Sequence, residues 1–146
     1  MKTLTGLSRF TADPARKGLT YGLVTNPSAI TVDGRASWRA FEDAGLALGA
    51  LFGPEHGVLG MAQDAVEVAD STYRGIPAYS LYGERTKPLP RQLKGLDAVV
   101  FDIQDVGCRY YTFIYTLAAV MEACAEGRVP LVVLDRPNPV GGLIVE

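Results

Sequence analysis

Five short apolar runs constrain the fold of this chain more than any other feature. They are Tyr21–Thr25, Ala47–Phe52, Pro77–Leu81, Ala98–Asp102 and Pro130–Asp135. Four of them are nearly continuous rather than alternating, which is typical of strands buried on both faces of a parallel sheet. Helical stretches and loops rich in Gly, Pro and polar residues separate the runs. This order predicts an α/β fold with a doubly wound, mostly parallel, Rossmann-like sheet and right-handed crossovers.

Three helices are expected between the runs. The first begins at Ser37, which can cap it, and ends at Gly45. A short helix lies around Pro90–Lys94. The longest covers about 110–126 and stops at Gly127. Because apolar residues occupy most of its surface, we expect this last helix to be well covered.

The length of 146 residues is enough for one ordinary domain and too little for two. The last segment, Val140–Glu146, is mostly apolar and brings neither a helix nor a polar tail. We therefore expect residues 1–146 to form a single Rossmann-like α/β domain, truncated at its C-terminus. Such a domain would be the N-terminal part of a longer two-domain protein.

Composition excludes several classes of protein. The 14 basic and 16 acidic side chains give a net charge of −2, so a nucleic-acid partner is not expected. One histidine, His56, and two cysteines, Cys108 and Cys124, are too few for a zinc site. The motifs GxGxxG, GxxxxGK[ST] and GxSxG are missing, and no cofactor is expected. No apolar run is long enough for a membrane helix, and the N-terminus lacks the apolar core of a signal peptide, which predicts a cytoplasmic chain.

Candidate functional residues follow the predicted strands, because ligands bind at the carboxyl ends of the strands in an open parallel sheet. Glu55 stands first among them. It lies beside His56 in a loop framed by Gly and Pro, directly after a buried strand. A carboxyl group there can be partly desolvated and tuned for general acid work. The alternative is that Glu55 only accepts a hydrogen bond from a neighbouring backbone N–H.

Asp102, Asp105 and Asp135 are possible partners for Glu55. Hydrolysis of a glycosidic bond generally uses two carboxyl groups, one as acid and the other as nucleophile or base. Asp102 and Asp105 could instead hold a hard cation such as magnesium through their oxygens. In the plainer interpretation, Asp102 caps the strand end and Asp105 caps the following turn.

Further loop residues are candidates for substrate binding. Arg109 and Arg136 can each clamp a carboxylate with two hydrogen bonds, or can pair internally with one of the aspartates. Tyr111, with Tyr110, can stack on a sugar ring or belong to the core. Polar contacts to a substrate could come from Asn26, Gln104, Asp135 and Asn138. Asn26 and Asn138 each stand beside a proline, and their alternative role is in turns.

Five motifs in register give these loops a family resemblance. They are Gly22–Ser28, Leu51–Gly57, Tyr79–Gly83, Val100–Gly107 and Leu134–Pro139. Together they closely resemble the DUF1343 family, the exo-β-N-acetylmuramidases of the NamZ type. The resemblance runs from about Leu19 to Glu146. Five separate motifs are far more specific than any one of them.

The resemblance implies a bacterial glycoside hydrolase that takes part in peptidoglycan turnover. Such enzymes release N-acetylmuramic acid from the non-reducing ends of peptidoglycan fragments, in a cleft between a Rossmann-like N-terminal domain and a C-terminal domain. It makes Glu55 the expected general acid, with His56, Asp102 or Asp105 supplying the second function. Arg109 or Arg136 would complement the lactyl carboxylate of the sugar. Where the second domain is missing, exposed apolar surface would favour self-association.

Two alternatives stay open. The chain could be a non-catalytic α/β module that binds a sugar or a protein partner without turnover. It could also be a metal-dependent hydrolase that uses Asp102, Asp105 and Glu55. Sugar binding without hydrolysis would favour the first alternative, and loss of activity with a chelator would favour the second.

Overall fold

The structure, a computed structural model, describes residues 4–54, 71–83 and 85–141. Six strands form one sheet in the order β3-β4-β2-β1-β5-β6. Their bounds are β1 Thr20–Thr25, β2 Ala47–Gly53, β3 Ser71–Tyr73, β4 Ile76–Ser80, β5 Ala98–Asp102 and β6 Leu131–Val133. Only the β3–β4 pair is antiparallel, and the other four pairs are parallel. The predicted α/β fold with a mostly parallel sheet is therefore confirmed.

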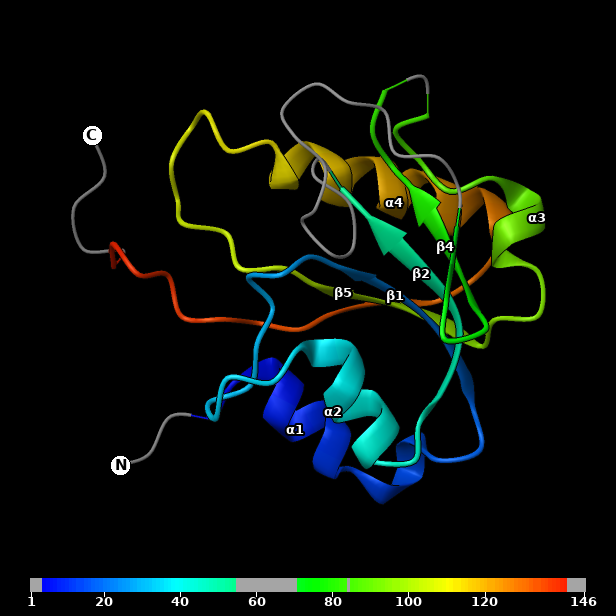
Figure 1. Cartoon of the computed structure of the whole chain (residues 1–146). Coiled ribbons are helices and arrows are strands. Elements are labelled where there is room, and N and C mark those ends of the chain that lie inside the picture. The colour runs from blue at the N-terminus through cyan, green and yellow to red at the C-terminus, as the bar shows by residue number, and fades with distance from the viewer. Residues whose placement is uncertain (1–3, 55–70, 84, 142–146) are drawn as a thin grey trace.

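Helices cover both faces of the sheet, as a doubly wound fold requires (Figure 1). The helices are α1 Gly6–Ala12, α2 Ser37–Asp43, α3 Pro90–Leu93 and α4 Phe113–Gly127, with a 3-10 turn, η1, at Pro14–Arg16. The first two helices lie on one face, and α3 and α4 lie on the other. The strand that follows the long helix, β6, returns parallel to β5 at the edge of the sheet.

The face under α1 and α2 is closed by three aromatic rings. Phe10, Tyr21 and Phe41 come from α1, β1 and α2, and their ring centroids are 5.4–6.0 Å apart. Two of the three pairs are edge-to-face, a geometry that favours aromatic contacts beyond the area they bury. The Tyr21 hydroxyl donates a hydrogen bond of 2.8 Å to the Arg16 carbonyl, so its polar end is also satisfied.

On the other face of the sheet, helix α4 is packed only on the side that faces the strands. Val120, Ala123 and Cys124 are buried against strand residues such as Phe52 and Val99. The outer side of the helix carries large apolar residues in water, namely Ile114, Tyr115 and Met121, which are 63%, 69% and 54% exposed. The expectation that this helix is well covered is wrong for its outer side, because nothing in the described part of the chain packs there.

The ends of helices α2 and α4 differ in detail from the predicted ones. Helix α2 has Ala36 at its N-cap, and the Ser37 hydroxyl instead pairs with the Thr25 hydroxyl at 2.8 Å in the interior. The expected Ser37 cap is therefore wrong. Helix α4 begins at Phe113, so residues 110–112 precede it. At the other end it includes Gly127, and Arg128 takes the left-handed conformation, with φ of 54°, that usually falls to glycine.

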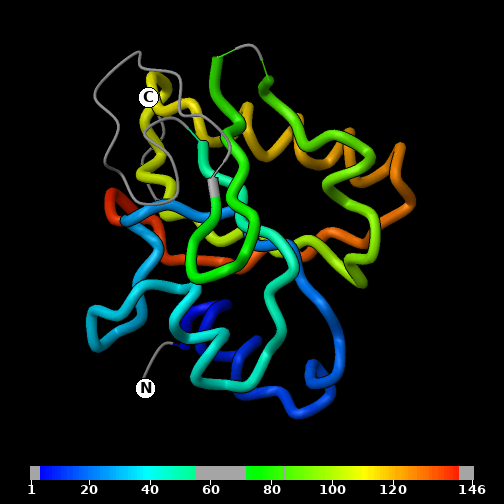
Figure 2. The backbone as a smooth tube through the Cα atoms, turned by 45° about the vertical axis from the view of Figure 1, so that its right-hand side comes forward, coloured from blue at the N-terminus to red at the C-terminus, as the bar shows by residue number. Residues whose placement is uncertain are grey.

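The segments that follow β1, β5 and β6 gather on one side of the molecule. Figures 1 and 2 show them together, the first in blue and cyan, the second in yellow and the third in red. This is the carboxyl edge of the sheet, where the candidate residues were expected. The fold therefore brings three of the five candidate loops to one place.

Candidate functional site

The strand order reverses at β1, and this places two loops beside each other. Strand β1 pairs with β2 on one side and with β5 on the other, and Thr25 lies opposite Asp102 in the register. The segments that leave β1 and β5 therefore start as neighbours. In open α/β sheets, such a reversal opens the crevice in which ligands bind.

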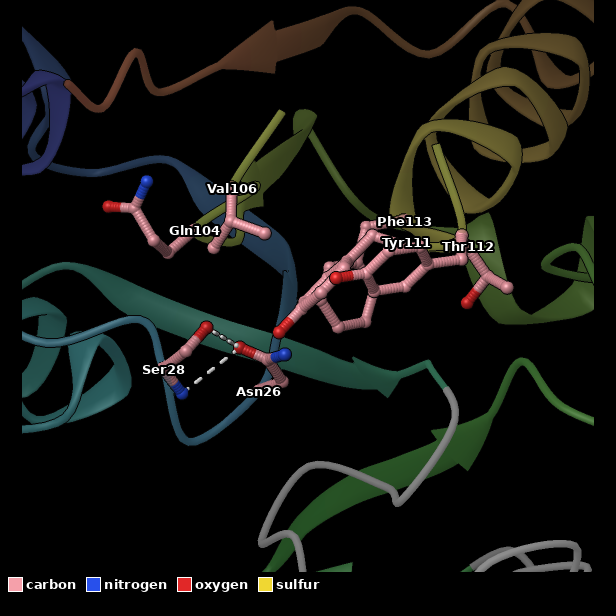
Figure 3. Close-up of a pocket in the computed structure, with 8 residues that line it drawn as sticks. Asn26, Ser28, Gln104, Val106, Tyr111, Thr112 and Phe113 are labelled. Carbon is pink, nitrogen blue, oxygen red and sulfur yellow. Dashed lines mark hydrogen bonds between the residues drawn. The ribbon is translucent and has the colours of Figure 1, made fainter. Parts of the chain in front are cut away.

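A pocket of about 410 Å³ opens at this point. The segments after β1 and β5 and the start of α4 supply its lining, which consists of Asn26, Ser28, Gln104, Val106, Tyr110, Tyr111, Thr112 and Phe113. Figure 3 shows Asn26 and Ser28 facing the rings of Tyr111 and Phe113 across the hollow. The size is within the range of small-molecule sites.

One side of the pocket is a tight turn built on Asn26. Its Oδ1 accepts hydrogen bonds from the Ser28 backbone N–H at 3.1 Å and from the Ser28 hydroxyl at 2.6 Å (Figure 3). Asn26 is therefore both the turn former and the pocket residue that the sequence suggested as alternatives. Its side-chain nitrogen makes no hydrogen bond within the residues the structure describes, so this amide can donate to a ligand.

The opposite side is aromatic. Tyr110, Tyr111 and Phe113, which we call the aromatic wall, form two ring contacts with centroids 5.7 Å apart. The neighbouring Cys108 thiol raises the pKa of the Tyr110 hydroxyl above its ordinary value. Exposed rings beside amide and hydroxyl groups can stack on the apolar face of a cyclic ligand while the polar groups meet its edge.

Gln104 joins the pocket to the loop after β6. Its Nε2 donates to the Asp105 carbonyl at 2.7 Å and to the Pro137 carbonyl at 3.1 Å. Asp105 holds the next turn, because its Oδ1 accepts the Gly107 N–H at 2.7 Å. One oxygen of Asp105 is thus bound to the backbone, and the other accepts no hydrogen bond from the described residues.

Asp102 and Arg136 form a buried ion pair. The carboxylate is fully buried and the arginine side chain is 7% exposed. Arg136 Nε donates to Oδ1 at 2.6 Å and Nη2 donates to Oδ2 at 2.9 Å, while Nη1 donates to the Ile30 carbonyl at 3.0 Å. The internal ion pair, which the sequence left as an alternative, is present. Neither side chain lines the pocket.

The remaining candidates lie around the pocket rather than in it. Asn138 accepts the Val140 N–H at 3.1 Å in a turn of its own. The Asp135 carbonyl accepts the Gly6 N–H at 2.7 Å, and this residue lines a different hollow beside α1. Arg109 is exposed and has no ion pair among the described residues.

Glu55 and His56 lie outside the residues that the structure describes, so their predicted roles remain predictions. The described ranges contain no group of three or more His, Cys, Asp or Glu side chains that could hold a metal ion. Because Glu55 is not described, this leaves the metal-dependent alternative untested. No helix within the described ranges is long and apolar enough to cross a membrane.

Four pocket residues were not singled out as binding candidates from the sequence. They are Ser28, Val106, Thr112 and Phe113. Ser28 follows Asn26 by two positions, a spacing that signals a turn but not a pocket. Thr112 and Phe113 belong to the predicted long helix, so their place at its open end became visible only in three dimensions.

Comparison with known proteins gives concordant results. The family model described as exo-beta-N-acetylmuramidase NamZ, N-terminal, matches residues 21–146. A peptidoglycan beta-N-acetylmuramidase NamZ of Bacillus subtilis is 47% identical over 150 residues, covering 99% of this chain. Two crystal structures of DUF1343 family proteins from Bacteroides fragilis superpose with TM-scores of 0.83 and 0.75, at 41% and 29% identity over 97% and 95% of this chain.

The chain spans 36% of the length of each of these three relatives. The matching family model is an N-terminal one, so the remainder of such proteins extends mainly beyond the matched region. The likeness therefore establishes the fold and the kinship of this domain, and it leaves the activity of the whole relatives to be argued separately.

Proposed function

Since this chain belongs to the family of exo-beta-N-acetylmuramidase NamZ N-terminal domains, we propose that it acts in the hydrolysis of peptidoglycan sugars. The reaction is the release of N-acetylmuramic acid from the non-reducing ends of peptidoglycan fragments. In this proposal the carboxyl edge of the sheet is where the sugar binds.

The pocket after β1 and β5 is the observation that carries the proposal. Two of the five family motifs, Gly22–Ser28 and Val100–Gly107, contribute Asn26, Ser28, Gln104 and Val106 to its lining. A pyranose ring has apolar faces and a rim of hydroxyl groups. The aromatic wall suits the former, and the side-chain nitrogen of Asn26, which is unbonded among the described residues, suits the latter.

Glu55 is the proposed general acid. It would protonate the glycosidic oxygen, which leaves with the rest of the peptidoglycan fragment. A second carboxyl group or histidine must then stabilise the sugar or activate water. Asp105, with one oxygen bound to the Gly107 N–H, and His56 are the candidates for this role. Asp102 is poorly suited, because it is buried and both of its oxygens accept hydrogen bonds from Arg136.

Arg109 is the proposed partner of the lactyl carboxylate of N-acetylmuramic acid. It lies in the loop that leads to the aromatic wall, it is exposed, and no described carboxylate neutralises it. An exposed guanidinium can form two parallel hydrogen bonds to a carboxylate. Tyr111, with Tyr110, would then lie against the ring, with Asp135 and Asn138 supplying only loop structure.

The outer side of α4 is the proposed contact surface. Ile114, Tyr115 and Met121 expose apolar area that is unusual for an isolated domain. In the longer relatives, the part beyond the N-terminal domain is the proposed partner of this side. In the 146-residue chain alone, a second copy is its proposed partner.

The experiment that tests the catalytic proposal measures release of N-acetylmuramic acid from a β-linked chromogenic muramide by the purified chain. The substitution Glu55→Gln should abolish turnover, because the amide keeps the shape but cannot donate a proton as an acid. Glu122→Gln, at an exposed position on α4, is the matched control and should keep full activity. Circular dichroism confirms that each variant is folded.

Retained turnover in Glu55→Gln would remove this residue from the acid role. A folded chain that binds N-acetylmuramic acid without turning over the muramide would instead favour the non-catalytic sugar-binding module. Repeating the assay on a full-length relative, such as the Bacillus subtilis protein, separates a divided active site from a wrong substrate.

A further inference from the structure

The loop after β6 contributes no residue to the pocket lining, yet it is bonded to both loops that do. Arg136 reaches the end of β5 through Asp102 and the loop after β1 through the Ile30 carbonyl. These contacts join residues that are 34 and 106 positions apart in the sequence. One guanidinium therefore connects three separate loops of the carboxyl edge.

The guanidinium is committed mainly to the protein interior. Three of its five N–H groups, one each on Nε, Nη1 and Nη2, donate hydrogen bonds inside the protein, and the side chain is only 7% exposed. A substrate carboxylate that took the place of Asp102 would strand a side chain that has no exposed surface and no other partner among the described side chains. Leaving that carboxylate buried without a partner would be strongly unfavourable.

Two further contacts hold the same loop in place. The Pro137 carbonyl accepts a hydrogen bond of 3.1 Å from Gln104, which itself lines the pocket. Gly107 lies so close to Asn138 that a Cβ added there would be 2.5 Å from the Asn138 Nδ2. The position of the pocket residue Gln104 is thus coupled directly to the segment that Arg136 anchors.

We propose that Arg136 is a positioning residue, which acts through Asp102 and Ile30 to set the relative placement of the two pocket loops. It does not itself recognise the substrate. The part of this proposal that concerns sugar affinity rests on the proposed function, whereas the part that concerns loop placement does not. The proposal separates two arginines that the sequence could not distinguish, with Arg136 internal and Arg109 available to the ligand.

The first test uses the unmodified protein and nuclear magnetic resonance of the arginine Nε–H groups. The Arg136 Nε–H should exchange slowly with solvent, because it is buried and bonded to a carboxylate. The exposed Arg109 provides the internal comparison and should exchange rapidly. Equal, rapid exchange at both sites would overturn the proposal without any reference to sugar.

The second test compares Arg136→Lys with Arg109→Gln. Lysine keeps the charge at position 136 but cannot form the three-way fork. Amide hydrogen exchange should accelerate at residues 26–30 and 103–107 in Arg136→Lys, while helix α2 keeps its protection. The affinities for N-acetylmuramic acid and for N-acetylglucosamine, which lacks the lactyl carboxylate, should fall by the same factor. Arg109→Gln should weaken binding of the acid alone.

Arg136→Lys could instead lose affinity for N-acetylmuramic acid but not for N-acetylglucosamine, with unchanged amide exchange in both loops. That result would mean that Arg136 binds the substrate directly, and it would overturn the proposal. If Arg136→Lys does not fold, the same exchange and affinity measurements are made on Asp102→Asn, which keeps the shape of the acceptor side chain and removes its charge. If the unmodified protein binds neither sugar, the proposed function fails, and the exchange measurements still decide the role of Arg136.

Discussion

The two faces of the sheet are packed to different degrees. Under α1 and α2, the rings of Phe10, Tyr21 and Phe41 are at most 5% exposed and contact one another. On the other face, the side of α4 that faces the sheet is equally buried, as Val120 shows, but the opposite side of the helix leaves Ile114 63% exposed. The aromatic core under the first pair of helices is closed to water, whereas the helix over the second face carries apolar surface that a further layer could cover.

This difference is the basis for proposing the outer side of α4 as a contact surface. The pocket opens at the start of α4, on the incompletely covered side, where Phe113 belongs to both the helix and the pocket lining. A partner on the outer side of α4 would therefore lie close to the proposed sugar site. The three predictions below test the contrast between the faces, from the largest expected effect to the smallest.

Phe41→Ala should cost about 3–5 kcal/mol in the free energy of unfolding, because it leaves a cavity inside the closed face. Phe113→Ala makes the same chemical change at a half-buried position at the start of α4 and should cost clearly less. Urea denaturation followed by circular dichroism measures both. Equal losses for the two variants would break the contrast between the faces.

A pH titration tests how dry the inner side of α4 is. Burial raises the pKa of the Cys124 thiol from 9.0 to about 11. The unfolded chain releases this proton first, so the free energy of unfolding should decrease as pH rises from about 9 to 11. Below pH 9 the thiol is protonated in both states and contributes no pH dependence.

The control for this titration is a pair of cysteine variants. Cys124→Ala should flatten the decline between pH 9 and 11, whereas Cys108→Ala should keep it. Burial also raises the pKa of Tyr21, which adds to the decline above pH 10 in every variant. An unchanged slope in Cys124→Ala would mean that this side of the helix is open to water.

Ile114→Ser should change the free energy of unfolding by no more than about 0.5 kcal/mol, since the side chain is exposed and the two residues have similar helix propensities. It should nevertheless weaken self-association, measured by sedimentation equilibrium as a function of concentration. Val32→Ser is the control, because Val32 is 77% exposed and lines a hollow beside α1 and α2, on the other face of the sheet from α4. Equal effects of both substitutions would argue against α4 as the contact surface.

The strands of the core were predictable, because a strand buried on both faces must be apolar at nearly every position. Strand β5 matches its predicted range, and β1 and β2 differ by one residue. Three elements escaped prediction, namely α1, the 3-10 turn η1 and β3. Helix α1 buries only Leu7 and Phe10, which is too little for a periodic signal, and β3 has three residues joined to β4 by a tight turn.

The candidate site was predictable as a location but not as a set of contacts. The rule that ligands bind at the carboxyl ends of strands pointed to the loops after β1 and β5, and a pocket opens between them. The sequence could not show which arginine pairs with which aspartate. Asp102 and Arg136 are 34 residues apart, and other arginine–aspartate pairs would balance the charges equally well. The Ser37 cap failed for a similar reason, since a buried hydroxyl 12 residues away competes for its hydrogen bond.

The central position of β1 has a consequence for the order in which the protein is made. Its partner β5 follows so late that the backbone bond from Asp97 to Thr20 closes a separation of 77 residues. At ordinary rates of synthesis, roughly 4–15 s pass between the two strands leaving the ribosome. During that time β1 can pair with β2 along one edge while its other edge stays open. The strand that is central in the finished sheet is thus an edge strand with unpaired backbone groups for several seconds of every translation.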